Sequence, residues 1–482
     1  MKKTYLLLAF SGTLLLAILL TSFNNSKKPS SGSASPDTTT LPSFALAKDH
    51  KGVSVVNTNR FVTFTSGLDN DYYQLDSINR RGYLYIETKM DQFVNESAKK
   101  IPLNLSIVID RSGSMAGEKM EFAKKAAKEI IDKLSANDFV SVVIYDEYID
   151  VIQNSVSVTY KDSIKAKIEK VKPRGSTNLW GGSEKGYEQV KATYKKNYVN
   201  RVLLISDGLA NAGMVSPLRI KTKVQEYKDV DGITISTFGV GLDYNETLMT
   251  DMAEGGAGNY YFIDKADKMA AIFDKELNGL LNVVAQNAEL RITLPRGVSV
   301  EKIYPFKYEQ VKNEIVIKFR DLFSEEAKGL MLQFKLDDYI DKDLKFQSRL
   351  VYTDIVDNQQ KIITNENTLL PIKNVDAYLT HFNKTVAEQV VLFTANENME
   401  KAMAEADKGN YEAARGYATS NASYFKSNAL YVKSSKELQR MDSANQFYND
   451  DLARAREMST DSVKIMQKGK KALNYQIRNK KQ

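Results

Sequence analysis

The chain has 482 residues, 43% hydrophobic and 26% charged, which is the composition of a folded protein with room for about three domains. Lys and Arg outnumber Asp and Glu by seven, and the excess lies at the ends: +4 in residues 1–28 and +6 in residues 461–482. The intervening body is slightly acidic at −3, which argues against a nucleic-acid surface, and we expect the basic C-terminal segment to be a solvated helix end. The absence of cysteine excludes disulfides, zinc fingers and thiol catalysis.

The N-terminus has the pattern of an export signal. Lys2 and Lys3 precede an apolar run over residues 5–20, as in secretory signals. The run is short for a spanning helix, and no A-x-A cleavage site follows it directly, so a cleaved signal and a retained membrane anchor both stay open for residues 1–22. In either case we expect the remaining chain in the cell envelope, the periplasm or the exterior. Residues 23–52, rich in Ser, Thr and Pro at first, predict a flexible linker.

Two segments show the period-2 alternation of antiparallel strands, namely residues 53–100 and 284–374. Gly82-Tyr83-Leu84-Tyr85-Ile86-Glu87 in the first segment and Glu314-Ile315-Val316-Ile317-Lys318-Phe319 in the second illustrate the pattern. A segment with a different hydrophobic pattern separates them. We therefore expect one β-sandwich, built from the strands on both sides of an inserted domain.

The inserted segment, residues 101–283, alternates apolar strands with amphipathic helices. Four strand-like runs occur at 103–109, 139–144, 201–205 and 233–238. The first helix pattern between them places its apolar residues on one face: Met120, Ala123, Ala127, Ile130, Ile131 and Leu134. This order predicts a doubly wound, Rossmann-like α/β domain with a parallel sheet covered on both faces. Residues 375–482, without proline and rich in helix formers, predict an all-α C-terminal domain.

Oxygen-bearing side chains gather where strands of the α/β domain end. Asp110-Arg111-Ser112-Gly113-Ser114 offers one carboxylate and two hydroxyls at alternate positions of a turn. Thr177, within Gly175-Ser176-Thr177-Asn178-Leu179, and Asp207, within Ser206-Asp207-Gly208, follow in later loops. Ligands of such sheets bind at the carboxyl ends of the strands, and Mg²⁺ takes about six oxygen ligands, some of them water. The five side chains predict a divalent-cation site for Mg²⁺, although Mn²⁺ and Ca²⁺ also suit oxygen ligands; the first motif alone would equally fit a polar helix cap.

These motifs resemble the metal-ion-dependent adhesion site of the von Willebrand factor A family, and residues 101–283 resemble its domain throughout. The G-S-T-N-L loop, the S-D-G turn and the I-S-T-F-G-V-G strand follow the first motif in the family's order. The resemblance implies that Ser112, Ser114 and Thr177 are direct or near-direct ligands, whereas Asp110 and Asp207 act mainly through waters or hydrogen bonds. Many relatives have Thr at the position of Ser206, which is not a ligand. The resemblance also implies that an acidic side chain of a partner protein fills the open coordination position.

The strands on both sides also resemble bacterial relatives of inter-alpha-trypsin inhibitor heavy chains and of calcium-activated chloride channel regulators. The channel-regulator relatives carry an H-E-x-x-H zinc protease motif. Neither His50 nor His381 lies in such a motif, so we do not expect that activity.

Around the predicted site we assign a partner-binding rim of Arg111, Arg174 and Trp180, with Lys119 nearby. Basic side chains there would favour the approach of an acidic partner. Trp180 is the only tryptophan and follows the Thr177 loop closely, so that a place in the core fits it equally well.

The predicted function is metal-dependent protein binding without catalysis. A scaffold that assembles through the helical C-terminal domain around a structural α/β core is an alternative. A metal-dependent hydrolase is a further one, but it needs a general base near the metal, and Asp146 and Glu147 are the only nearby acids the sequence suggests. The hydroxyl-dominated ligand set without histidine favours binding.

Overall fold

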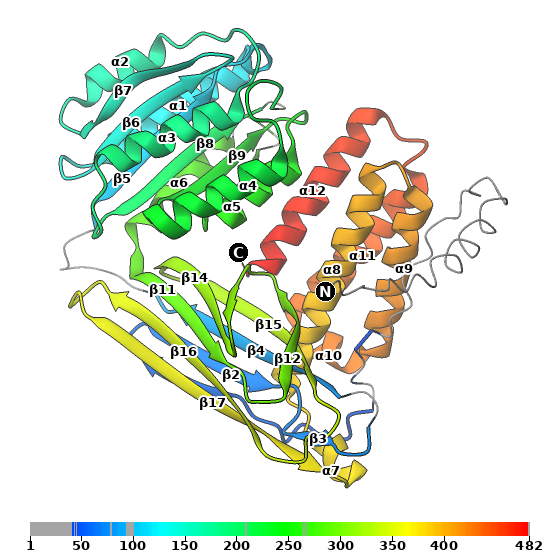
Figure 1. Cartoon of the computed structure of the whole chain (residues 1–482). Coiled ribbons are helices and arrows are strands. Elements are labelled where there is room, and N and C mark those ends of the chain that lie inside the picture. The colour runs from blue at the N-terminus through cyan, green and yellow to red at the C-terminus, as the bar shows by residue number, and fades with distance from the viewer. Residues whose placement is uncertain are drawn as a thin grey trace, which may run out of the picture.

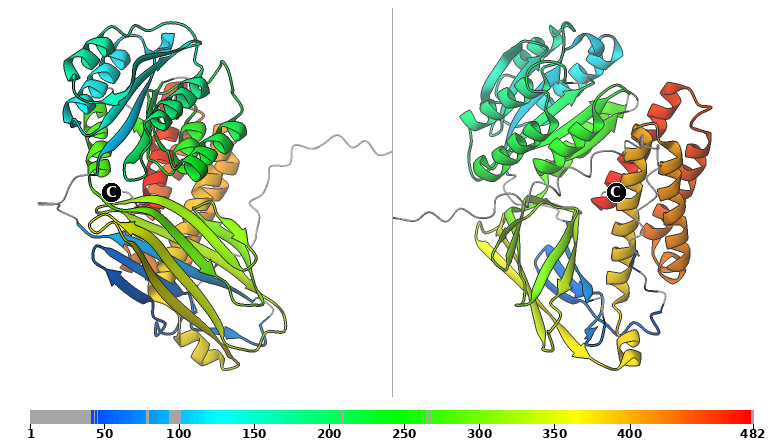
Figure 2. Two further views of the ribbon diagram at one scale, coloured as in Figure 1. Left: turned by 60° about the vertical axis from the view of Figure 1, so that its left-hand side comes forward. Right: turned by 45° about the vertical axis from the view of Figure 1, so that its right-hand side comes forward.

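The computed structural model describes residues 41–42, 44, 46–77, 80–92, 101–207, 210–263, 265 and 268–480. They form an α/β domain at one end, two β-sheets at the other, and a group of helices along the side (Figure 1). Two further views show the same arrangement (Figure 2). The apolar run at residues 5–20, and with it the predicted signal or anchor, lies outside the described residues. Within them, no helix is both long and apolar enough to cross a membrane.

The α/β domain is built on a six-stranded sheet in the order β10-β9-β8-β5-β6-β7, in which β7 alone runs antiparallel to its neighbour. Its strands are β5 (Leu103–Asp110), β6 (Phe139–Tyr145), β7 (Ile149–Ser157), β8 (Val199–Ser206), β9 (Thr234–Val240) and β10 (Tyr260–Ile263). Its helices are α1 (Glu118–Lys133), α2 (Lys161–Glu169), α3 (Leu179–Ala192), α4 (Pro217–Glu226), α5 (Glu246–Gly255) and α6 (Met269–Leu281), with short turns η1 (Gly113–Met115) and η2 (Tyr227–Asp231).

The predicted doubly wound α/β fold is confirmed. One apolar cluster packs α1, α2 and α6 against one face of the sheet, and a second packs α3, α4 and α5 against the other. All six apolar residues predicted for the first helix are buried, because α1 turns that face to the sheet. The sequence patterns missed β7, an edge strand with a half-exposed face, and β10, which has only four residues.

The other two sheets each combine strands from before and after the α/β domain. The five-stranded sheet has the order β1-β2-β4-β15-β12 and the six-stranded sheet the order β13-β14-β11-β16-β17-β3. The strands that precede the domain are β1 (Val55–Asn59), β2 (Val62–Leu68), β3 (Tyr72–Gln74) and β4 (Arg81–Met90). Those that follow it are β11 (Val283–Thr293), β12 (Val298–Tyr304), β13 (Glu309–Val311), β14 (Glu314–Phe323), β15 (Ala327–Leu336), β16 (Leu344–Asp354) and β17 (Gln360–Ile372). Both sheets contribute to a single apolar cluster.

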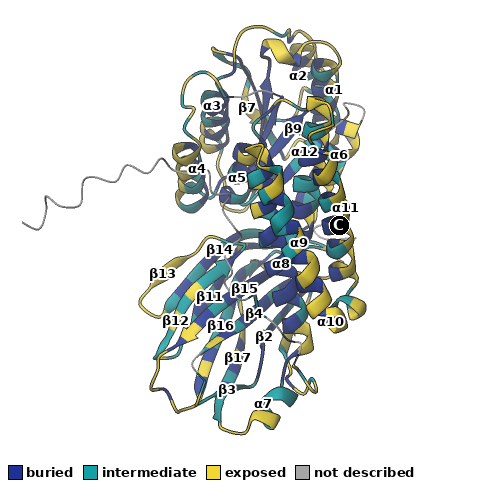
Figure 3. Cartoon of the chain, turned by 90° about the vertical axis from the view of Figure 1, so that its right-hand side faces the viewer, coloured by how far each residue is buried: buried dark blue, intermediate teal, exposed yellow. Residues whose placement is uncertain are grey.

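The C-terminal region is helical, as predicted. Its helices are α7 (Val375–Thr380), α8 (Lys384–Asp407), α9 (Tyr411–Ser427), α10 (Ala429–Ser434), α11 (Lys436–Arg454) and α12 (Thr460–Arg478). Figure 3 shows α8 buried over much of its length, because it packs against α9, α11 and α12 as well as strands β4 and β15.

Of the predicted linker, residues 23–40, 43 and 45 lie outside the described residues, and the part that is described, Phe44 and residues 46–52 above all, is not a flexible segment. Phe44 is buried against Phe382 and Tyr431, in the cluster that holds the C-terminal helices together. The backbone amide of Lys48 donates to a carbonyl at the end of α7, with an N–O distance of 2.8 Å. His50 forms a β-bridge with His381, so the two histidines that are distant in sequence are neighbours in space. A single buried ring and backbone hydrogen bonds therefore fix this part of the chain.

The basic C-terminal segment is not a solvated helix end either. Helix α12 lies between the other C-terminal helices and the α/β domain (Figure 1). Its cations contact acidic side chains on both sides, in the pairs Lys464–Asp243 (2.8 Å), Lys471–Asp407 (2.6 Å), Arg478–Glu254 and Arg478–Glu400. The positive charge of this segment is thus neutralised by acidic side chains of the same molecule.

Candidate metal centre

The predicted site residues lie at the carboxyl edge of the parallel sheet. Asp110 ends β5, and Asp207 follows directly on β8, the strand beside it. From β5 the chain crosses first to β6 on one side and later to β8 on the other, so the two loops flank the point at which the strand order reverses. Such a point is where open α/β sheets bind their ligands.

Asp110 is buried with both carboxylate oxygens hydrogen-bonded. The backbone amide of Ser112 donates to Oδ1 (2.8 Å), and the hydroxyl of Ser206 donates to Oδ2 (2.6 Å). Burial raises the pKa of Asp110 to about 6, and these two donors partly offset that effect. The carboxylate therefore holds the turn that presents the next hydroxyls, and a nearby cation would further favour its ionised form.

Ser112, Ser114 and Asp207 form a chain of oxygen atoms. Ser114 Oγ donates to Asp207 Oδ1 (2.8 Å) and lies 3.1 Å from Ser112 Oγ. The ammonium group of Lys119, from the first turn of α1, contacts Asp207 Oδ2 and lies 3.2 Å from the carbonyl oxygen of Ser114. A positive charge thus already stands beside the predicted ligands.

Thr177 is carried to the same edge by a loop joined to the first motif. The amide of Gly113 donates to the carbonyl of Gly175 (3.0 Å). The backbone amide of Thr177 donates to the side chain of Asn211 (2.8 Å), which no sequence pattern had singled out. Gly175 has φ of +70°, and a Cβ there would lie 1.9 Å from the carboxylate of Glu147, so only glycine fits this turn. The loop thereby fixes Thr177 with its side chain nearly buried.

The donor set fits a hard cation that keeps part of its water. In the described part of the chain, no group of three or more His, Asp and Glu side chains is placed to hold a metal. The candidate site instead combines two carboxylates with three hydroxyls, all of them oxygen donors, as Mg²⁺ prefers. Hydrogen bonds bring Asp110, Ser112, Ser114 and Asp207 together, and Thr177 joins them through its loop.

Comparison with known proteins identifies the domain that carries this site. Residues 104–275 match the family described as von Willebrand factor type A domain. The chain thus contains a VWA domain over residues 104–275. It is 34% identical over 214 residues to the uncharacterized protein YfbK of Escherichia coli (strain K12), and 29% identical over 174 residues to human inter-alpha-trypsin inhibitor heavy chain H2. These alignments cover 44% and 34% of this chain, but only 37% and 18% of the two relatives.

Solved structures share the fold at low sequence identity. A von Willebrand factor type A protein from Catenulispora acidiphila matches with a TM-score of 0.64 and 15% identity, over 80% of this chain and 91% of its own. The ArnB paralog VWA2 from Sulfolobus acidocaldarius matches with a TM-score of 0.57 and 16% identity, over 85% and 98%. At such identities these matches show the fold alone, and that likeness extends beyond the VWA domain.

Trp180 is a core residue, and its assignment to the rim is wrong. Its side chain is 3% exposed and packs with Tyr187 and Tyr227, whose ring centroids lie 6.5 and 6.4 Å away. The reason is its place in the first turn of α3, on the side that packs against the sheet of the VWA domain.

The two rim arginines differ in position. Arg111 is buried and pairs with Asp146 (2.8 Å) and Asp150 (2.5 Å), so its assignment as an available rim charge is also wrong. The side chain of Arg174 is 57% exposed, although its Nε lies 2.6 Å from Asp146. The guanidinium of Arg174 stands 5.8 Å from the ring centre of Tyr148, an exposed aromatic residue that the sequence patterns did not mark. The rim beside the VWA site therefore presents Arg174 and Tyr148.

Proposed function

We propose that this protein is an exported, non-enzymatic binding protein whose VWA domain holds a divalent cation, Mg²⁺ by preference, and captures an acidic side chain of a partner protein. The observation that carries the proposal is the hydrogen-bonded chain from Asp207 through Ser114 to Ser112 at the carboxyl edge of the sheet. The contact of the Lys119 ammonium group with Asp207 supports it further, since the site already favours positive charge.

In this proposal Ser112, Ser114 and Thr177 supply hydroxyl ligands, while Asp110 and Asp207 orient them and balance the charge. The cation would act as a Lewis acid that attracts a partner carboxylate. The residues of the chain provide the geometry: Asp110 fixes the first turn, and the hydrogen bond of Asn211 fixes the loop of Thr177.

Export and presentation of the site belong to the same proposal. The pattern of residues 1–22 supports export, with residues 5–20 as a removable signal or a membrane anchor. We also propose that the two mixed sheets form one β-sandwich into which the VWA domain is inserted. Both sheets combine strands from the two sides of the domain and share an apolar cluster. The sandwich would then present the site on the far edge of the inserted domain.

The acids suggested for a hydrolase are engaged in other contacts. Asp146 is buried, and although burial alone would raise its pKa, Arg174 and Arg111 hold that pKa below its usual value. The carboxylate of Glu147 accepts a hydrogen bond from the backbone amide of Ser176 (2.7 Å), which lowers its pKa. A carboxylate stabilised as the anion is a poor general base, so this geometry favours binding over hydrolysis.

Calorimetric titration of the metal-free, full chain with Mg²⁺ and Mn²⁺ tests the metal site. We expect saturable binding that is lost in Ser112→Ala and at least tenfold weaker in Thr177→Val, which removes one hydroxyl and keeps the shape. Ser176→Ala is the matched control, since it removes an exposed neighbouring hydroxyl that faces Glu147. Absence of binding in the unaltered protein would reject the proposal.

The second half of the proposal, capture of a partner protein, is tested by measuring how much partner the protein retains. Partner protein retained by the wild type with Mg²⁺, and released by a chelator or by Ser112→Ala, would support an adhesion role. Equal retention under all three conditions would contradict it.

A further inference from the structure

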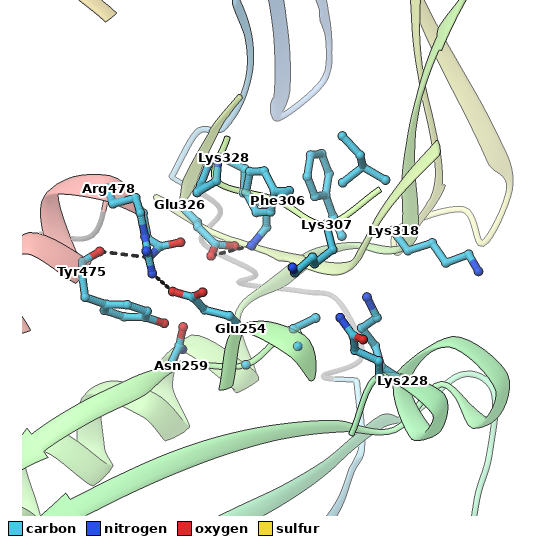
Figure 4. Close-up of a pocket in the computed structure, with 18 of the residues that line it drawn as sticks. Lys228, Glu254, Asn259, Phe306, Lys307, Lys318, Glu326, Lys328, Tyr475 and Arg478 are labelled. Carbon is cyan, nitrogen blue, oxygen red and sulfur yellow. Dashed lines mark hydrogen bonds and ion pairs between the residues drawn. The ribbon is translucent and has the colours of Figure 1, made fainter. Parts of the chain in front are cut away.

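Three parts of the chain enclose a cavity at the opposite edge of the VWA sheet from the candidate metal centre. Its wall comes from η2 and the end of α5 in the VWA domain, from strands β14 and β15, and from the end of α12 (Figure 4). Asn259, which precedes β10, places the cavity at the amino edge of the parallel strands. The cavity volume is about 90 Å³, within a wider hollow of about 980 Å³ that includes open solvent. Junctions of this kind are common ligand sites.

The lining carries more positive than negative charge. Its charged residues are six cations and two acids: Lys221, Lys228, Lys307, Lys318, Lys328, Arg478, Glu254 and Glu326. Three of the cations have a carboxylate of their own, in the pairs Lys328–Glu326, Arg478–Glu254 and Lys221–Asp251. Lys318 pairs outside the lining with Glu309 (3.1 Å), so the excess of positive charge remains on Lys228 of η2 and on Lys307, in the loop between β12 and β13.

Lys228 and Lys307 are poorly neutralised. Lys228 is only 9% exposed, and its ammonium group lies 3.3 Å from Asp229, which is also within 4.0 Å of both Lys318 and Arg320. Because Lys318 is closer to Glu309 (3.1 Å), Asp229 serves mainly Lys228 and Arg320, so one carboxylate is shared by two cations. Burial lowers the pKa of Lys228 accordingly. Lys307 has no ion pair with any residue that the structure describes, and Figure 4 shows it extending between Glu254 and Lys228, whereas Lys318 points outward.

An apolar surface lies beside these charges. Phe306 borders the cavity and packs edge-on against Phe319, with 5.1 Å between ring centroids. The ring of Tyr475, from α12, borders the other side. Tyr475 is buried, whereas Phe306 is partly exposed, so a small inorganic anion would satisfy the lysines but leave the ring of Phe306 facing water.

We propose that this junction cavity binds an organic anion, with the negative group between Lys228 and Lys307 and the apolar part against Phe306. The ligand would contact both the VWA domain and the sheets beside it. The proposal is independent of the metal site, because the two lie at opposite edges of the sheet.

A matched pair of dyes tests both halves of the proposal on the full chain. 1-Anilinonaphthalene-8-sulfonate carries a sulfonate on an aromatic body, and N-phenyl-1-naphthylamine is the same molecule without it. We expect saturable fluorescence enhancement with the anionic dye at a single site, and at least fivefold weaker binding of the neutral dye. Lys307→Gln and Lys228→Gln should each weaken the anionic dye at least fivefold. Raised salt should weaken it as well.

Lys335→Gln is the control, since Lys335 is exposed at the far end of β15 and outside the cavity lining. Lys307 is itself exposed, so its replacement leaves the fold intact even if the buried Lys228 proves necessary for stability. The same affinity for the anionic dye in Lys307→Gln, Lys335→Gln and the wild type would overturn the proposal. Equal binding of both dyes by the wild type would overturn it too.

Discussion

Lys119 places an ammonium group against the residues proposed to hold the cation. It contacts the carboxylate of Asp207, which is wholly buried, and lies 3.2 Å from the carbonyl oxygen of Ser114. Without a metal, this ammonium group neutralises a carboxylate that would otherwise be buried and unpaired, a costly state. A divalent cation entering the proposed site must compete with it. The basic side chain would thus lower the metal affinity of the proposed site.

The first prediction concerns Lys119→Met, which keeps the length of the side chain and removes its charge. We expect the affinity for Mg²⁺ to rise about tenfold, equivalent to ~1.4 kcal/mol, because the competing cation is gone. The metal-free variant should also unfold more readily. Calorimetric titration measures the first effect, with Lys125→Met, an exposed lysine of α1, as the control. If the wild type binds Mg²⁺ and Lys119→Met binds it with the same affinity, the proposed competition is rejected.

For single residues, the sequence identifies the oxygen donors of the candidate site better than the side chains that contact them. Ser112, Ser114 and Asp207 lie in short motifs whose spacing predicts their convergence. Lys119 is predicted only as a rim charge, because its contact with Asp207 depends on how η1 turns the chain into α1. Asn211 carries no local signal at all. Its role appears only when two loops distant in sequence are placed side by side.

At the level of elements, a buried ion pair joins β8 to α6 in the VWA domain. Arg201 and Glu276 are each 1% exposed in their side chains and lie 2.8 Å apart. Glu276 also accepts hydrogen bonds from Asn259 (2.7 Å) and Tyr261 (2.8 Å), which flank and form β10. Burial opposes ionisation of Glu276, but Arg201 and these donors hold its pKa below the usual value. The pair thereby ties the last helix of the domain to its sheet.

The second prediction is that Glu276→Ala lowers the free energy of unfolding by about 3–5 kcal/mol, because it leaves the buried charge of Arg201 without its carboxylate. The double variant Arg201→Met/Glu276→Leu should recover much of this loss. Urea unfolding followed by the fluorescence of Trp180 measures it, since the only tryptophan of the chain is buried in this domain. An equal loss in the single and double variants would show that packing, rather than the unpaired charge, sets the cost.

The third prediction concerns pH and the end of β2. Burial raises the pKa of Asp69 to about 7, although its carboxylate accepts a hydrogen bond from the backbone amide of Tyr83 (2.8 Å). The folded state therefore holds this proton more tightly than the unfolded state, so stability is highest at low pH and falls as pH rises through 7. Ionisation at pH 8 would cost on the order of 4 kcal/mol.

Thermal unfolding at pH 5 and pH 8 measures this effect. The wild type should be more stable at pH 5, and Asp69→Asn should raise the midpoint at pH 8 and reduce the difference. Glu400, whose burial also raises its pKa to about 7, should leave part of the difference in place. Asp341→Asn, at an exposed loop position, is the control. A pH dependence that is the same in Asp69→Asn as in the wild type would refute the assignment.

Across the whole molecule, sequence patterns predict the parts better than the contacts between them. Hydrophobic period distinguishes helices from strands within each segment, because it depends on residues a few positions apart. It does not show that Phe44 is buried among the C-terminal helices, or that Lys464 and Arg478 pair with acids of the VWA domain. Those contacts join residues more than 200 positions apart. They show that Phe44, in the predicted linker, and the basic helix α12, which both look solvated in sequence, are structural.

One of these contacts connects α12 with the candidate metal centre. Lys464 pairs with Asp243 (2.8 Å) in the loop after β9, and Lys468 donates to the carbonyl of Tyr244 (3.0 Å) in the same loop. The positive charge of Lys119 also acts on Asp243 and, after Lys464, helps to lower its pKa. If a metal displaces Lys119 from Asp207, the released ammonium group can turn to Asp243 and compete with Lys464 there.

The fourth prediction follows from that competition. Saturating Mg²⁺ should increase hydrogen exchange of backbone amides near Lys464 in α12, because the pair that holds this turn weakens. Coupling between two sites is reciprocal, so Lys464→Gln, which frees Asp243 for Lys119, should tighten Mg²⁺ binding. The pair is partly exposed and worth about 0.2–1 kcal/mol, which limits the expected gain in Mg²⁺ affinity to between about 1.4-fold and fivefold. In Lys119→Met the same replacement should have no effect, since the released cation is absent. If Lys464→Gln raised the Mg²⁺ affinity equally in the wild type and in Lys119→Met, α12 would act on the metal site by a route that does not involve Lys119.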